Sequence, residues 1–137
     1  MVRRLLHHRK SNRSGLAIVE FAIALPVFVL IVMATIESSS MIFMKQSLEI
    51  SAYEGVRTAL VRGSNENNVI GSCNQILEAR SVTAAVVTVT PSNFSSLNYG
   101  DYIQVSVAAP CSENSLLGPW FYGGRTLVAT AEMMKEF

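Results

Sequence analysis

The mostly apolar run from Leu16 to Ile36 constrains this chain more than any other feature. Glu20 is its single charged residue, and a basic segment precedes it. A helix needs roughly 20 predominantly apolar residues to cross about 30 Å of hydrocarbon. We therefore expect a membrane-spanning helix over residues 16–36.

The charges on the two sides of this run differ. Five of the eleven Lys and Arg residues precede Gly15 without any acid among them, whereas six basic and ten acidic residues follow it. Segments that stay in the cytoplasm carry the excess of Lys and Arg. We expect residues 1–15 to be a cytoplasmic leader and the rest of the chain to lie outside. This topological role explains the basic cluster better than nucleic-acid binding does.

A secretory signal peptide also combines a basic start with an apolar core. Its apolar region is usually about 7 to 15 residues long and ends at a cleavage site of small residues. The run here is longer, and no convincing Ala-x-Ala site follows before the helical pattern continues through residues 38–40. We therefore expect the apolar run to be kept as an anchor.

Glu20 lies near the hydrocarbon, where an ionised carboxylate costs about 2.5 kcal/mol or more unless it is compensated. Cutting the chain after Gly15 would create a positive amine at a similar depth, in the same subunit or in a packed neighbour. Glu20 would then be a docking acid. The alternative is a carboxylate at the edge of the run, hydrated among the headgroups.

Two short motifs in this sequence resemble a known family. Residues 13–22 read RSGLAIVEFA, with Leu25-Pro26 after them, and are similar to the class 3 signal of type IV prepilins. The closer resemblance is to the TadE/TadF-like minor pilins, or pseudopilins, of tight-adherence (Tad/Flp, type IVb-like) pili. Residues 51–57, SAYEGVR, are similar to that family's A-x-E-G-A-R stretch. Its characteristic positions fall here on Glu54, Gly55 and Arg57.

The resemblance implies a processing step. In the family, a membrane prepilin peptidase cuts after the glycine, so Gly15 would end the leader and Leu16 would become the new N-terminus. Glu20 would then be the fifth mature residue. Pro26 would let the helix kink or partly melt on entering a filament, because proline donates no N–H and its ring crowds the preceding turn. The alternative is a proline merely accommodated by the bilayer.

The resemblance also implies partners and a location. The expected partners are a prepilin peptidase, other major and minor pilins, the inner-membrane pilus assembly platform and the lipid bilayer, with no nucleic acid. The expected location is the bacterial inner membrane, crossed once, with a cytoplasmic N-terminus and a periplasmic head. Incorporation in a cell-surface pilus is a further location that the resemblance implies.

The helical pattern continues beyond the membrane to about Arg62, where Gly63 is a stop signal. We expect residues 37–62 to form the extracytoplasmic part of one long helix. Lys45 with Glu49, and Glu54 with Arg57, are opposite charges at helical spacing, and Gly55 should permit close approach by the sheet or by a neighbouring subunit. An apolar stripe should cover one face, formed by Met41, Met44, Leu48, Ala52, Gly55 and Ala59.

Residues 63–137 remain for a small head. Ser64 or Asn65 can cap a short second helix. Its residues at helical spacing are Val69, Cys73, Ile76, Leu77 and Arg80, so Cys73 should face inward with the apolar residues. Strands are expected at residues 83–90, 101–109 and 125–134, from β-branched content and two-residue alternation. The predicted fold class is α+β and pilin-like: a long N-terminal transmembrane and stalk helix, a short second helix and a three-stranded antiparallel sheet.

Cys73 and Cys111 are the only cysteines. In a head outside the cytoplasm a disulfide between them is permitted, and we favour it over the alternative of two buried thiols. Their number and spacing fit neither a zinc site nor a C-x-x-C redox pair.

An aromatic loop, residues 116–124, separates the last two strands and contains Trp120, Phe121 and Tyr122 between glycines. Clustered aromatic residues on a loop can mark a partner surface. In so small a head they can equally close one end of the core, which we favour.

The hypothesis that follows is a minor pilin or pseudopilin that takes part in assembly or initiation of a Tad-type adhesion pilus. The alternative is a single-pass envelope protein whose head binds a partner without entering a filament. We expect no enzyme, because no histidine follows His8 and no carboxylate pair lies on a recognisable scaffold. We expect no catalytic residue, cofactor or metal site, since the pair His7-His8 lacks further ligands.

Overall fold

The structure is a computed structural model that describes residues 13–136. The chain divides into two units, Met1–Met33 and Ala34–Phe137. Helix α1, Arg13–Ala59, begins in the first unit and ends in the second. The predicted leader lies mostly outside the described residues, and so does the pair His7-His8.

Helix α1 ends earlier than the sequence predicts. After Ala59 the chain tightens, because the Leu60 amide donates to the carbonyls of both Val56 and Arg57 and a short turn follows. Gly63 has φ +80°, a left-handed conformation that glycine adopts without strain. The predicted glycine stop is therefore present, but Arg62 lies beyond the last helical residue.

The face of α1 that packs in the second unit is the predicted stripe. Val56 also belongs to it, as do the small polar residues Ser47 and Ser51. Ser47 satisfies its hydroxyl within the helix by donating to the carbonyl of Phe43 at 2.8 Å. The stripe is confirmed by the burial of Met41, Met44, Leu48, Ala52, Gly55 and Ala59.

Helix α2, Glu66–Ala79, is capped as predicted. Asn65 has extended backbone angles, and its side chain accepts a hydrogen bond from the Asn68 amide at 3.0 Å. This bond satisfies one of the helix's otherwise unpaired N–H groups. Val69, Cys73 and Leu77 are buried along one face, which confirms the inward position of Cys73.

The sheet contains β1 (Val86–Thr90), β2 (Tyr102–Pro110) and β3 (Thr126–Met134) in the order β1-β2-β3. Both pairings are antiparallel. The first strand starts later than predicted, because Thr83 is tied to another segment: its amide donates to Asn114 Oδ1 at 2.8 Å and its hydroxyl to the Glu113 carbonyl at 3.0 Å.

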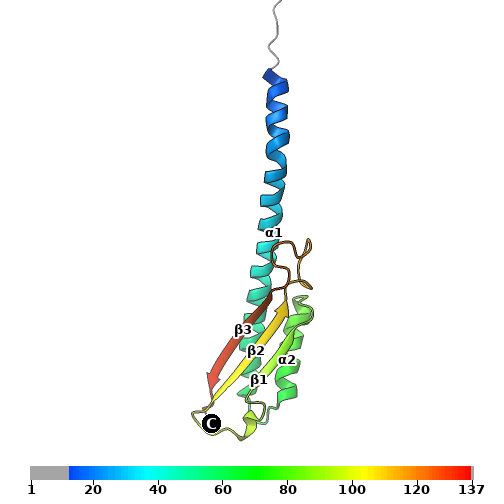
Figure 1. The fold of residues 1–137 in the computed structure, drawn as a ribbon. Helices are drawn as coiled ribbons and strands as arrows, with labels where there is room; N and C mark the ends of the chain where they lie inside the picture. The colour runs from blue at the N-terminus through cyan, green and yellow to red at the C-terminus, as the bar shows by residue number, and fades with distance from the viewer. Residues whose placement is uncertain (1–12, 137) are drawn as a thin grey trace, which may run out of the picture. The chain divides into compact units, whose positions relative to one another are not determined.

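The core lies between the sheet and the two helices. Figure 1 shows the strands running across the C-terminal half of α1, with α2 alongside β1. The inward side chains of β2 are completely buried, and those of β3 pack against the same core. The Lys45 ammonium joins α1 to β3 by donating to the Val128 carbonyl at 2.6 Å. The predicted α+β class, with a long apolar N-terminal helix and a three-stranded antiparallel sheet, is confirmed.

Candidate functional site

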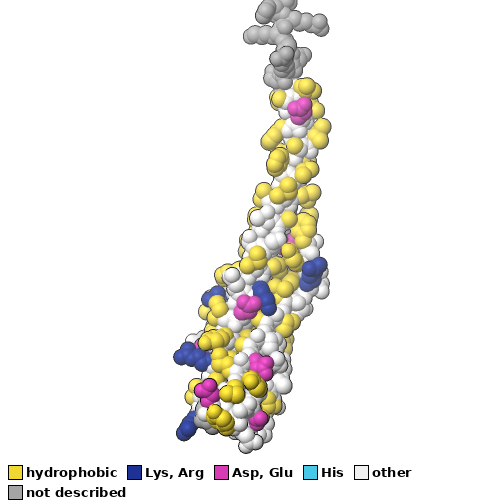
Figure 2. All heavy atoms as spheres, turned by 90° about the vertical axis from the view of Figure 1, so that its left-hand side faces the viewer, with side chains coloured by type: hydrophobic (Ala, Val, Ile, Leu, Met, Phe, Trp, Pro, Cys, Tyr) yellow, Lys and Arg dark blue, Asp and Glu magenta, His cyan; other side chains and the backbone are white. Residues whose placement is uncertain are grey.

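The predicted processing residues lie in the first turns of α1. Leu16 is exposed, as is Glu20, and the space around Gly15 is open. Among the described residues, α1 from Gly15 onward is the one helix long and apolar enough to cross a membrane, and its most apolar window has no side chain buried inside the chain. Figure 2 shows apolar side chains covering this part of the helix on the face in view. Its surface is therefore available to lipid or to other helices.

Pro26 lies inside α1, and the helix continues through it. The kink expected there stays a prediction. An open apolar hollow of about 360 Å³ lies on the same part of the helix, lined by Phe21, Leu25, Phe28, Val29, Val32 and Met33. The described residues that line this hollow are all apolar, so it suits an apolar neighbour.

The motif at Glu54, Gly55 and Arg57 is a packing element with a salt bridge. The Arg57 Nη1 lies 3.5 Å from Glu54 Oε2, and the arginine side chain is largely exposed. A side chain at Gly55 would put its Cβ 2.5 Å from Cys73 Sγ and 3.0 Å from Val105 Cγ1. Gly55 thus allows α1 to approach α2 and the sheet of its own chain.

The expected disulfide is not formed, since Cys73 and Cys111 are both free and buried. Cys73 lies beside Val105, near the middle of β2, whereas Cys111 directly follows the strand. From Val105 to Cys111 the extended chain advances six residues, or about 20 Å at roughly 3.3 Å per residue. A disulfide needs Cα atoms within about 7 Å. The strand direction therefore separates the two sulfurs.

Cys73 instead joins the two helices. Its Sγ donates to the Ser51 carbonyl at 3.4 Å, and the Ser51 hydroxyl donates to the Cys73 carbonyl at 3.2 Å. Burial raises the pKa of the Cys73 thiol; the Ser51 hydrogen bond opposes this and the charge of Glu54 adds to it. Burial likewise raises the pKa of the Cys111 thiol, against the opposing charge of Arg125.

These thiols should be free and slow to react. We expect mass spectrometry of protein isolated without reductant to find the Cys73 and Cys111 peptides separately, each with a free thiol. Because the thiolate is the reactive form, a raised pKa keeps both groups neutral at pH 8. Titration with a thiol reagent should therefore be slow in the folded protein and rapid for two thiols after denaturation. A bridged peptide joining Cys73 to Cys111 would contradict this prediction.

The aromatic loop is held to α1 by a residue that the sequence analysis missed. Glu37 is buried in the head, and its carboxylate accepts from the Phe121 amide at 3.1 Å and from the Tyr122 amide at 3.0 Å. The hydroxyls of Ser38 and Tyr122 lie 3.2 Å apart. The available signal was a lone acid immediately after the apolar run, with no helical charge partner.

The favoured role of the aromatic loop as a core element is wrong for two of its three aromatic residues. Tyr122 is half-buried against the core, but Trp120 is 67% and Phe121 49% exposed. The loop nevertheless has a tight structure, because a Cβ at Gly123 would lie 2.6 Å from the Pro119 carbonyl oxygen. The loop therefore exposes the side chains of Trp120 and Phe121 on a defined backbone.

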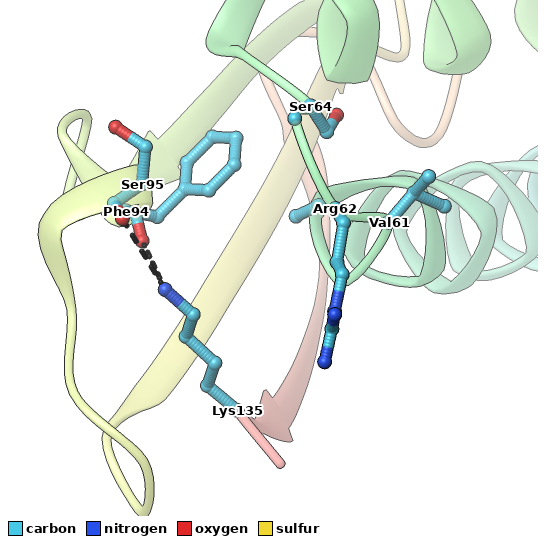
Figure 3. Close-up of a pocket in the computed structure, with 8 residues that line it drawn as sticks. Val61, Arg62, Ser64, Phe94, Ser95 and Lys135 are labelled. Atoms are coloured by element: carbon cyan, nitrogen blue, oxygen red, sulfur yellow. Dashed lines mark hydrogen bonds between the residues drawn. The ribbon is translucent and has the colours of Figure 1, made fainter. Parts of the chain in front are cut away.

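A second candidate site is a hollow of about 220 Å³ near the C-terminus. Figure 3 shows Lys135 reaching toward Phe94 and Ser95 from the strand end. Its ammonium donates to the carbonyls of these two residues and, at 2.8 Å, to that of Leu97. This lysine ties the segment after β1, including the short helix η1 (Phe94–Ser96), to the end of β3. The hollow therefore lies where Lys135 joins these two segments, and its polar contacts serve the fold.

The described residues contain no group of three His, Cys, Asp or Glu side chains that could hold a metal ion. The exposed apolar helix and the exposed aromatic loop are two surfaces that suit binding.

Comparison with protein families supports the resemblance seen in the sequence. Residues 15–57 match the model of the TadE-like protein family. Searches of curated proteins and of solved structures found no match. The matched segment begins at the expected processing glycine and ends at Arg57, so it includes residues 15–22 of the first motif and the whole of the second. The chain is therefore similar to the TadE-like family over the segment that holds its apolar run and the Glu54 to Arg57 motif.

Proposed function

We propose that this chain is a minor pilin or pseudopilin of a Tad-type pilus, cut after Gly15 by a prepilin peptidase and then used in assembly or initiation of the filament. The observation that carries the proposal is the TadE-like match over residues 15–57, which starts at that glycine. The protein is the substrate of the peptidase and a building block, and the chemistry belongs to the peptidase. Its head would lie in the periplasm and its anchor in the inner membrane.

The position of Gly15 supports access by a peptidase. It lies in the first turn of α1, where the leading N–H groups have no intrahelical partner and local fraying is easy. No atom of the described residues lies within 4 Å of a Cβ placed there. A membrane peptidase can therefore reach the bond between Gly15 and Leu16 without disturbing the head.

The spacing of Glu20 supports a docking role after the cut. Leu16 and Glu20 are four residues apart, so they share one face of α1 a single turn from each other. A new amine at Leu16 would lie close to the carboxylate, in the same subunit or in a neighbour packed alongside. Pairing would remove the cost of two isolated charges near the hydrocarbon.

The decisive experiment determines the N-terminus of the membrane-extracted protein from cells with and without the prepilin peptidase. We expect a start at Leu16 only where the peptidase is present, and loss of cutting in Gly15→Ala. Gly71→Ala is a matched control, since Gly71 is also an uncrowded helical glycine but lies in α2. Glu20→Gln should still be cut but should enter pili poorly.

An uncut N-terminal end in both strains, with normal piliation in Gly15→Ala, would overturn the proposal. The protein would then be a single-pass envelope protein whose head binds a partner without entering a filament.

A further inference from the structure

The aromatic loop is fixed to α1 where the apolar run ends. Glu37 immediately follows Ile36, the last residue of that run, and holds the amides of Phe121 and Tyr122. Ser38 adds the contact with the Tyr122 hydroxyl. Figure 1 shows the segment between β2 and β3 beside this part of α1. All of these groups belong to the second unit, so the loop has a defined position next to the last apolar turn.

The side chains that the loop exposes are large and apolar. Leu116 is 76% exposed and Leu117 43%, in addition to Trp120 and Phe121. No charged residue occurs between Glu113 and Arg125. The loop satisfies polar groups internally, since the Ser115 hydroxyl donates to the Gly118 carbonyl at 2.7 Å and the Trp120 amide to the same carbonyl at 2.9 Å. Such a loop can leave bulk water at low cost.

Charged groups lie at the rim of the loop. Arg80 lines a surface hollow together with Leu116, and the Arg125 guanidinium lies 5.7 Å from the centre of the Tyr122 ring. Glu113, an exposed acid, precedes the loop in the sequence. Aromatic and apolar side chains flanked by arginine are typical of the boundary between hydrocarbon and headgroups, where the rings and the cations each find suitable surroundings.

We propose that the aromatic loop is a second membrane contact, in which Leu116, Leu117, Trp120 and Phe121 enter the headgroup region of the bilayer that α1 spans. Arg80 and Arg125 then face lipid phosphates. This inference rests on the membrane anchoring in the proposed function. Its consequence is that the head lies against the membrane surface through a preformed loop, and that extraction into a filament must break this contact as well as remove the helix.

Trp120 provides the test, because it is the only tryptophan of the chain. The full chain is reconstituted in vesicles of phosphatidylethanolamine and phosphatidylglycerol, and its fluorescence is quenched either by aqueous acrylamide or by lipids that carry a quencher near the headgroup or deep in the acyl chain. We expect blue-shifted emission, acrylamide quenching several-fold weaker than for an exposed indole, and stronger quenching by the shallow lipid than by the deep one.

The matched control moves the probe to the other end of the sheet. In Trp120→Phe combined with Tyr99→Trp, the indole precedes β2 instead of following it, at a position where the native tyrosine is 73% exposed. This control should emit as in water and be quenched fully by acrylamide.

Equal acrylamide quenching of Trp120 and of the control, in protein that floats with the vesicles, would overturn the loop proposal and leave the anchor intact. It would assign the loop to a protein partner. Protein that fails to float with the vesicles would overturn the anchor itself, and the loop proposal with it.

Discussion

Glu37→Ala is expected to lower the free energy of unfolding of the head by about 2 to 3 kcal/mol and to release the aromatic loop. A hydrogen bond to a charged group contributes about 1.5 to 3 kcal/mol, and removal of one partner leaves the others to bear a desolvation penalty. Here a single carboxylate serves the amides of both Phe121 and Tyr122, so truncation unpairs two donors together. Truncation also removes the packing contacts of the Glu37 side chain, which is buried and only 2% exposed.

The measurement is denaturant unfolding of the full chain in detergent micelles, together with hydrogen exchange of the peptide that covers the loop. Glu37→Gln should fall between the native protein and Glu37→Ala, since one side-chain oxygen can still accept. Glu49→Ala is the control on the same helix. The Glu49 side chain is 58% exposed and its carboxylate pairs with Lys45 across 3.4 Å, so its loss should change stability by less than about 1 kcal/mol. Equal stability and loop exchange in the Glu37 and Glu49 variants would contradict the prediction.

Local signals were sufficient to predict most of the fold. The spacing of apolar residues along α1 and α2 follows the helical repeat, and their burial confirms the predicted faces. Alternation in β2 does the same for the sheet, since Ile103, Val105 and Val107 are all buried. These patterns are visible in the sequence because each repeats within one element.

The errors concern contacts between residues distant in the sequence. Cys73 was correctly expected to face inward, but its separation from Cys111 depends on which part of β2 each cysteine lies beside, and periodicity carries no such information. Glu37 was overlooked because its partners are the backbone amides of residues 121 and 122, and a pattern of side chains does not predict backbone partners. The role of the aromatic loop was misjudged for the same reason. Once Glu37 holds its backbone, only Tyr122 packs inward and the neighbouring rings are exposed.

Gly55 shows how the structure decides between two readings of a family motif. The sequence allowed its small size to serve either the chain's own sheet or a neighbouring subunit. Gly55 is buried, and a Cβ there would meet Cys73 Sγ at 2.5 Å and Val105 Cγ1 at 3.0 Å. The space is therefore occupied by the same chain, and the motif glycine acts first on the stability of the head.

We accordingly expect Gly55→Ala to lower the free energy of unfolding by about 1 to 2 kcal/mol. Overpacking a core usually costs about 1 to 3 kcal/mol, and the higher helix propensity of alanine returns up to about 1 kcal/mol. Gly71→Ala isolates the effect of helix propensity, because no described residue has an atom within 4 Å of its Cβ position in α2. The control should therefore gain up to about 1 kcal/mol, opposite in sign to Gly55→Ala, in the same denaturant titration.

A double mutant identifies the clash. Cys73→Ala removes the sulfur that lies closest to the new Cβ, so Gly55→Ala combined with Cys73→Ala should be more stable than the sum of the two single changes by about 1 kcal/mol, within the range found for residues in contact. Additive effects would show that the strain falls on Val105 instead. The packing role would be contradicted if Gly55→Ala kept the native unfolding midpoint but lost piliation. Gly55 would then lie in a contact between subunits, because only a surface partner could sense the added methyl group.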